Sequence, residues 1–486
     1  MHNEIIMNDA LNRNSMTFWG LVFYAIMVIA PAGPFAFTGA TAMEYAGETA
    51  PLTFLIGGIA LFLAVIAVYI YSEKISNAGG YYKYVEVATH SKYLSKSVGF
   101  YYLFVVLSSI IGSSALLGWF LYVGLEVMLN YTLPFVFVVI VSFITPVIYL
   151  IVGILSLNYS QKIAIVMGLF DLAFFLGLSI AIIIKSPYNG VQYFNIFNST
   201  NGLHGFFLGM VTGGFVAFSG YGSIVVLAEE TKTPGRTIKK AIVTSLLIMI
   251  AYDTFVIYAN VGGLGPNLPA GLAFFAPGLY VTDSYYGIYV TMAAFSIFLI
   301  SALISTVIFG NSAARELYSL ARDGILPKVF TRIHKKYKSP YMAVIAVFIV
   351  ALAGITLGLI PLVYYYGENH GLFYLLVINS IIGSVFTLSY HIIVNETLPV
   401  FMHHLRQLNP VTHIIAPTTA SAIIGIAIYY SLIDLTWPLS VAYIFLPGLV
   451  ILAIVITYYM RHNNVKMDTI EEENTKRAKR REKNDL

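Results

Sequence analysis

The sequence contains no cysteine, which excludes disulfide bonds, thiolate metal sites and cysteine nucleophiles. Charged residues are also scarce: they make up 10% of the 486 residues, whereas soluble domains carry about 25%. Neither a Walker-type phosphate-binding loop nor a metal-spaced group of His, Asp or Glu residues is present. We therefore expect no enzyme activity, no resident cofactor or metal, and no nucleotide or nucleic-acid partner.

Long apolar runs take the place of the missing charge, and 58% of the residues are hydrophobic. A run of about 20 apolar residues can cross a bilayer as a helix. Twelve such spans are predicted, at residues 16–45, 51–73, 98–129, 133–153, 160–184, 205–230, 238–262, 285–314, 341–361, 370–394, 411–432 and 439–460. The sequence therefore predicts an all-α integral membrane protein with twelve transmembrane helices in the lipid bilayer.

Positive charge is distributed unevenly along the chain. If the N-terminus is placed in the cytoplasm, 26 of the 27 Lys and Arg residues fall in cytoplasmic segments, and only Lys185 lies outside. Cytoplasmic loops of membrane proteins carry an excess of Lys and Arg. We therefore predict a multi-pass protein of the cell (plasma) membrane with both termini in the cytoplasm.

Two of the predicted spans contain residues that interrupt a helix. The first span carries two prolines around Ala-Gly at residues 30–34, and the sixth carries Ser-Gly-Tyr-Gly at residues 219–222. Proline removes a backbone donor, and an unpaired backbone group in hydrocarbon costs several kcal/mol. Such breaks persist where protein or a water-filled cavity meets the freed groups, as in the substrate sites of many secondary transporters. Simple kinks are the alternative interpretation.

The two breaks lie five spans apart, which favours two inverted repeats of five helices. The expected organisation is a cytoplasmic tail at 1–15, a transporter domain at 16–460 and a charged cytoplasmic tail at 461–486. Within the domain we expect a first repeat at 16–184, a second at 205–394, and two appended helices at 411–460.

Three motifs resemble those of one transporter superfamily. They are FVAFSGYGSIVVLAEETKTPGRTIKKAI in the sixth span, NSAARELYSLARDGILP after the eighth, and YSEKISNAGGYYKYVEVA at the end of the second. Their order and topology resemble the amino acid–polyamine–organocation superfamily. The resemblance implies a leucine-transporter-like fold with broken helices one and six, and most often amino-acid transport.

The chain departs from the superfamily pattern at both breaks. Many relatives have Gly-Ser-Gly at the first break, where this chain has Pro31-Ala32-Gly33-Pro34. Because Pro34 has no amide hydrogen, the amides of Ala32, Gly33 and Phe35 would have to meet a substrate carboxylate. Many relatives also carry Glu where this chain has Gly222, so strong selectivity for cationic amino acids is not expected.

The breaks define the expected substrate site. Amides at the start of the half-helix after the first break would bind the substrate carboxylate, and carbonyls of the second would bind its ammonium group. The candidate substrate-binding residues are Ala32, Gly33, Pro34, Phe35, Phe218, Ser219, Gly220 and Tyr221. For the aromatic side chains, core or lipid-facing packing is the alternative. Few polar wall residues are expected (Ser108, Ser109, Ser113 and Ser114 among them), which favours a neutral or small apolar amino acid.

Asp171 lies near the middle of the fifth span with no Lys or Arg close in sequence. An ionisable group at that depth is a functional candidate. The resemblance places it near the eighth span, where Ser301, Ser305 and Thr306 could supply oxygens for a coupling ion, and a proton is favoured over sodium. The alternative is a buried Asp bonded to a neighbouring helix. Asp253, in the seventh span, is a second such carboxylate, for which simple hydrogen bonding is the favoured interpretation.

Charged residues at the cytoplasmic ends of the spans form a candidate gate. Its members are Glu229, Glu230, Arg236, Arg315 and Arg322, for which solvated surface charges are the alternative. His391, in the tenth span, is interpreted as a hydrogen-bonded core residue rather than a proton carrier. The sequence thus predicts a cation-coupled secondary transporter for amino acids or related amines, working by alternating access. An amino-acid or amine exchanger and a passive, channel-like facilitator are the alternatives, and the oligomeric state is left open.

Overall fold

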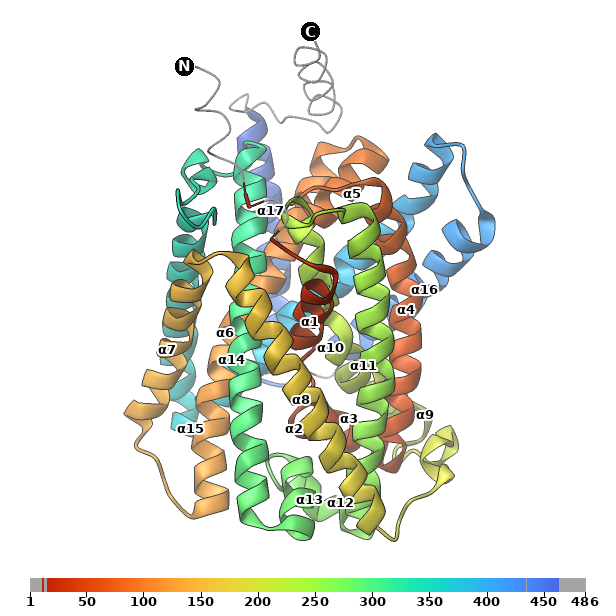
Figure 1. The fold of residues 1–486 in the computed structure, drawn as a ribbon, viewed down its shortest axis with the longest axis vertical. Coiled ribbons are helices and arrows are strands. Elements are labelled where there is room, and N and C mark those ends of the chain that lie inside the picture. Colours follow the sequence, from red (N-terminus) through yellow and green to blue (C-terminus); the bar gives the residue numbers. More distant parts are fainter. Residues whose placement is uncertain (1–10, 13–14, 434, 463–486) are drawn as a thin grey trace.

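The computed structural model describes residues 11–12, 15–433 and 435–462, so the predicted tails fall almost entirely outside the described residues. Twelve helical segments are long and apolar enough to cross a membrane, which confirms the predicted number. Their bounds are Phe18–Ala36, Thr38–Lys74, Lys92–Leu129, Phe135–Ile154, Leu157–Lys185, Gly202–Glu230, Pro234–Ala273, Ile288–Arg322, Tyr341–Glu368, His370–His404, Val411–Tyr430 and Leu439–Ile456. Figure 1 shows them as a bundle around α1.

The helices of the first half follow the predicted order. They are α1 (Phe18–Ile29), α2 (Gly33–Ala36), α3 (Thr38–Ala46), α4 (Ala50–Lys74), α5 (Gly80–Thr89), α6 (Lys92–Leu129), α7 (Phe135–Ile154) and α8 (Leu157–Lys185). Of these, α1 to α3 form the first span, and α5 is a short helix that lies between the second and third spans. A 3₁₀ turn, η1 (Gly47–Thr49), joins α3 to α4.

The second half begins with a sixth span made of four segments. These are α9 (Gly202–Gly209), η4 (Met210–Phe215), α10 (Val216–Phe218) and η5 (Ser219–Glu230). The remaining helices are α11 (Pro234–Leu264), α12 (Leu268–Ala273), α13 (Pro277–Tyr286), α14 (Ile288–Arg322), α15 (Tyr341–His404), α16 (Ala416–Leu432) and α17 (Ala442–His462). Both the ninth and tenth spans belong to α15, in which Gly367 adopts a positive φ of 77°.

The first span is broken where its prolines predict a break. Helix α1 ends at Ile29, and the next residue, Ala30, adopts a left-handed conformation with φ 62°. This conformation costs a non-glycine residue about 1–2 kcal/mol. The chain resumes helical geometry at Gly33, with Pro34 in the first turn of α2, where a missing amide hydrogen is tolerated.

The sixth span is interrupted in a different way, by a change of winding. It passes from an α-helix to a π-helix, η4, and then through α10 to twelve residues of 3₁₀-helix, η5, which begins at Ser219. Runs of 3₁₀-helix longer than 3–4 residues are uncommon. Because hydrogen bonds shorten from i→i+5 to i→i+3 along this path, each step to tighter winding leaves one carbonyl oxygen without an amide donor.

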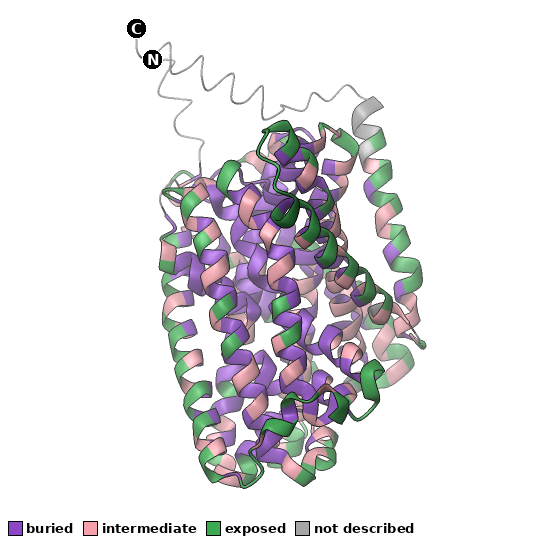
Figure 2. Cartoon of the chain, turned by 90° about the vertical axis from the view of Figure 1, so that its right-hand side faces the viewer, coloured by how far each residue is buried: buried purple, intermediate pink, exposed green. Residues whose placement is uncertain are grey.

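Corresponding helices of the two expected repeats pack on each other. Spans two and seven (α4 and α11), three and eight (α6 and α14), and one and six (α1 and η5) are in contact. A pseudo-twofold axis between inverted repeats would produce these pairs, while the repeat itself stays a prediction. Spans one and six occupy the core, with 83% and 88% of their apolar windows buried against 17% for span twelve. Figure 2 shows the buried residues gathered in the middle of the bundle.

Glycines of span six allow it to approach the backbone of span one. A Cβ atom added to Gly213 would lie 2.9 Å from the carbonyl oxygen of Thr38, and one added to Gly220 would lie 2.9 Å from that of Val28. Real Cβ atoms do not approach backbone this closely. The two interrupted spans therefore touch on both sides of the break in span one.

We predict that Gly220→Ala destabilises the protein by about 1–3 kcal/mol, because the methyl group forces spans one and six apart. Gly177→Ala is the matched control, since a Cβ atom at Gly177 meets nothing within 4 Å. Thermal unfolding of the two purified variants checks the prediction. Equal unfolding temperatures would show that the spans are not in close contact at Gly220.

Candidate functional site

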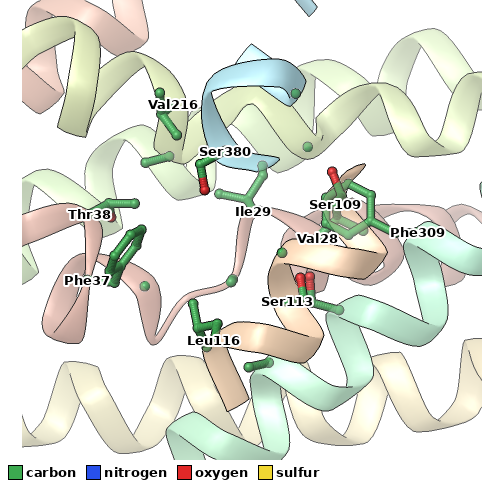
Figure 3. Close-up of a pocket in the computed structure, with 18 of the residues that line it drawn as sticks. Val28, Ile29, Phe37, Thr38, Ser109, Ser113, Leu116, Val216, Phe309 and Ser380 are labelled. Atoms are coloured by element: carbon green, nitrogen blue, oxygen red, sulfur yellow. The ribbon is translucent and has the colours of Figure 1, made fainter. Parts of the chain in front are cut away.

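A cavity of about 200 Å³ lies between the two interrupted spans. Span one contributes the residues around its break, from Val28 to Gly33, and span six contributes Val216, Ala217 and Gly220. The remaining walls come from α6, α14 and the span-ten part of α15. Figure 3 shows Ser109 and Ser113 of α6, Phe309 of α14 and Ser380 of α15 around the break.

The cavity is lined by hydroxyl groups and apolar side chains. Its polar lining consists of Thr38, Ser108, Ser109, Ser113, Ser301, Ser305, Asn379, Ser380, Ser384 and Thr387. None of the described residues that line it is charged. The buried hydroxyls of Thr38 and Ser301 have no hydrogen-bond partner among the described residues. The cavity therefore fits a small molecule whose charged ends are met by backbone groups and hydroxyls.

The break in span one offers backbone amides. The amide of Gly33 donates to the carbonyl oxygen of Ala30 at 2.7 Å and is occupied. Among the described residues, no backbone hydrogen bond is made by the amides of Ala32 or Phe35. Because Ala32 lines the cavity, its amide is the first candidate for a carboxylate group.

The predicted substrate residues divide into two groups. Ala32, Gly33 and Gly220 line the cavity, whereas Pro34, Phe35, Phe218 and Tyr221 do not, and the side chain of Ser219 lies outside the described part of the structure. The ring of Phe35 packs on Phe175, with centroids 4.9 Å apart, and that of Phe218 packs edge-on against Phe54 at 6.1 Å. These aromatic rings belong to the packing around the site.

Tyr221 lies beside the cavity rather than in its wall, and its hydroxyl is hydrogen-bonded to Nε2 of His391. The other ring nitrogen of His391 lies 2.7 Å from the carbonyl oxygen of Thr387, so Nδ1 carries the hydrogen and Nε2 accepts. His391 is buried and hydrogen-bonded, as the sequence interpretation expects. The contact joins span six to span ten next to Thr387, which lines the cavity.

The predicted coupling residues come together beside the cavity. Ser301 and Ser305 line it, and Thr306 donates to the carbonyl oxygen of Ala302 at 2.9 Å. Asp171 is buried, and its carboxyl group lies within interaction range of the Ser301 hydroxyl without meeting hydrogen-bond geometry. Asp171 is therefore separated from the cavity by a single hydroxyl-bearing side chain.

Four of the five predicted gate residues form ion pairs at the terminal end of spans six and eight. Arg315 is fully buried and binds Glu230 through two contacts, Nε–Oε2 at 2.7 Å and Nη2–Oε1 at 3.3 Å. Arg322 binds both carboxylate oxygens of Glu229 at 2.8 Å. Within the described residues, Arg236 is exposed and forms no ion pair.

A further buried ion cluster lies next to this gate and was not predicted. The Lys83 ammonium group contacts Glu86 at 2.8 Å and Asp323 at 2.5 Å, and Tyr82 donates to Asp323 at 2.8 Å. Burial raises the pKa of the Glu86 carboxyl in spite of Lys83. Burial opposes the charged form of Lys83, but the two carboxylates outweigh it, and the pKa of Lys83 is raised. Lys83 and Asp323 lie in two of the quoted motifs, which was the available signal.

A family model described as amino acid permease matches residues 16–470. The chain belongs to the amino acid permease family. This confirms the resemblance to the amino acid–polyamine–organocation superfamily, whose members are transporters rather than enzymes. Within the described residues, no group of three His, Asp or Glu side chains is placed to hold a metal ion.

Several curated relatives of this permease are transporters of named substrates. It is 25% identical to "Cationic amino acid transporter 2, vacuolar" of Arabidopsis thaliana, over 65% of this chain and 51% of the relative. It is 28% identical to a branched-chain amino acid permease of Bacillus subtilis, over 26% of this chain and 27% of the relative. An uncharacterized transporter of Mycobacterium tuberculosis is 30% identical over 29% of this chain and 32% of the relative. The chain spans about half the length of the first of these relatives.

We predict that Arg315→Met destabilises the permease by about 3–5 kcal/mol, because Glu230 is left buried without its partner. The double variant Arg315→Met with Glu230→Gln should recover much of this loss. Lys239→Met is the control, since the pair it breaks involves Glu73, whose side chain is 44% exposed, and an exposed pair contributes at most about 1 kcal/mol. Thermal unfolding of the three variants measures the difference. An effect of Arg315→Met no larger than that of Lys239→Met would contradict a buried ion pair.

Proposed function

We propose that the protein is a secondary active transporter of amino acids that works by alternating access and is coupled to a cation, with a proton favoured over sodium. The observation that carries this proposal is the uncharged cavity between the two interrupted spans. Family membership supports amino acids as the substrate class. The cavity supports a site in which backbone groups and hydroxyls take the two charged ends of the substrate.

We infer that the substrate has a neutral side chain. A cationic side chain inside the protein needs a carboxylate partner, because burying an unpaired charge is costly. The described lining residues supply no such partner. The printed names of the relatives include both cationic and branched-chain amino acids, and the chemistry of the cavity favours the second kind.

We propose Asp171 as the residue that couples transport to the ion. Its carboxyl group is buried within interaction range of Ser301, so a change in its protonation or ion occupancy would be felt at the cavity wall. An oxygen-only environment also suits sodium, which is a hard cation. The absence of any cationic partner of Asp171 among the described residues supports a proton, because an unpaired buried carboxyl group is most stable when neutral.

We place both termini in the cytoplasm of a cell whose plasma membrane holds the protein, because this orientation puts nearly all Lys and Arg residues on the inner side. In that orientation the pairs Glu230–Arg315 and Glu229–Arg322 act as the cytoplasmic gate. The backbone contact between the Met16 amide and the Glu230 carbonyl, at 3.0 Å, ties the start of span one to the same gate.

We predict that purified protein in proteoliposomes accumulates a neutral amino acid when a pH gradient is applied. Asp171→Asn should abolish accumulation but retain exchange of labelled for unlabelled substrate, because exchange needs no coupling ion. If the wild type exchanges but never accumulates under a proton or sodium gradient, the exchanger is the correct alternative. Flux without saturation or counterflow would favour a passive facilitator instead.

Narrowing the cavity tests whether it holds the substrate. Ala302 lines the cavity on α14, and Ala302→Leu should lower the transport rate at least about tenfold by filling space that the substrate needs. Ala173→Leu is the matched control, because Ala173 is exposed on the outer face of α8. Initial uptake rates of both variants give the answer. Unchanged uptake by Ala302→Leu would place the substrate elsewhere.

A further inference from the structure

Four polar side chains along α8 and α11 are buried and have no hydrogen-bond partner among the described residues. They are Asp171 and Ser179 of α8, and Asp253 and Asn260 of α11. An unpaired buried polar group costs about 1–3 kcal/mol, so four of them in one seam call for a physical reason. None of the four lines the cavity described above.

The relative heights of these groups follow from one contact. The hydroxyl of Ser186 donates to the carbonyl oxygen of Gly262 at 2.5 Å, which fixes the outer end of α8 against the outer end of α11. The two helices pack together and run in the same direction, because two spans separate them. Counting 1.5 Å per residue inwards from this contact, Asn260 lies about 3 Å below it, Ser179 about 10 Å, Asp253 about 14 Å and Asp171 about 22 Å.

The α11 members of the series face the interior. At 100° per residue, Asp253 and Asn260 lie on the arc of α11 between Gly263, which faces Ile182 of α8, and Ile257, which faces Gly39 of α3. This arc is turned towards the second part of span one. Figure 1 shows α8 and α11 with α2 and α3 nearby. The four polar groups therefore descend along the seam between spans one, five and seven.

The outer end of the seam opens into a second cavity of about 620 Å³. It is polar, and its lining includes Glu48, Asn189 and Gln192, together with Val261, the residue next to Asn260. This cavity lies at the end of the molecule opposite the gate, since Asn189 follows the outer end of α8. The first buried group of the series is thus one residue away from a polar cavity at the outer face.

The inner end of the seam reaches the break in span one. The hydroxyl of Tyr252 donates to the carbonyl oxygen of Pro31 at 3.2 Å. Asp253 and Asp171 are the two ionisable groups, besides its own environment, that act electrostatically on Tyr252. Among the described residues of α1, α4 and α8, no cationic side chain pairs with either carboxyl group. Tyr252 therefore lies between the two acids and holds the broken backbone.

We propose that this seam is a proton route from the outer face to Asp171 that is separate from the substrate cavity, with Asp253 as an intermediate proton site. A hydronium ion from the outer cavity gives its proton to the Asp253 carboxylate and becomes water. The neutral Asp253 then passes its proton to the Tyr252 oxygen while the Tyr252 hydroxyl proton moves to the Asp171 carboxylate. Asp253 ends ionised, Tyr252 is unchanged and Asp171 is neutral. The route rests on the proton coupling proposed above.

The test uses the full chain in proteoliposomes with an acidic outside. Asp253→Asn removes the intermediate acid, and Asn260→Leu blocks the seam near its outer end. Both should slow pH-driven accumulation at least about tenfold while exchange without a gradient stays within about twofold of the wild type. Asp283→Asn is the matched control, because Asp283 is exposed on α13.

A spectroscopic measurement keeps the test independent of transport. Infrared spectra of the protein in bilayers should show a carboxylic-acid C=O band that Asp253→Asn removes, and Asn260→Leu should slow the shift of this band after transfer to D₂O. Wild-type accumulation by both seam variants, with loss in Asp171→Asn, would overturn the route and leave the proposed function standing. A wild type that shows no pH-driven accumulation would overturn both.

Discussion

The structure depends on one constraint, that a backbone amide in the bilayer interior needs a partner. Span one violates it at Ala32, whose amide faces a cavity and makes no backbone hydrogen bond among the described residues. Three other elements stabilise this arrangement. Proline occupies positions where the amide would otherwise be lost, Tyr252 binds the freed carbonyl of Pro31, and the glycines of span six let that span lie against the broken backbone.

The two interrupted spans are held at the gate end by buried charges. Burying Arg315 and Glu230 is costly for each group alone, so the pair makes the closed arrangement cooperative: both charges stay together or both must reach water. The Lys83 cluster adds α5 to the same end of the bundle through Asp323. A gate built in this way opens as a unit, which is what alternating access requires of one side of a transporter.

Much of the fold could be predicted from the sequence, because apolar length and proline position act locally. The twelve spans and the break after Ile29 follow from single residues and runs. The places of Phe218 and Tyr221 could not be predicted in this way. In a 3₁₀-helix successive side chains turn by 120° rather than 100°, so the unforeseen winding of η5 changes which residues of span six face the cavity. Lys83 was missed because its partner lies 240 residues away along the chain.

The central claim is that the break in span one and the rewound part of span six together seat an amino acid. The most direct measurement is a structure of the protein determined by cryo-electron microscopy with a transported amino acid at saturating concentration. The account predicts ligand density in the cavity, with the carboxylate at the amide of Ala32 and the ammonium group at carbonyl oxygens between Val216 and Gly220. Density at another place, or a first span that runs as a continuous helix past Gly33, would contradict it.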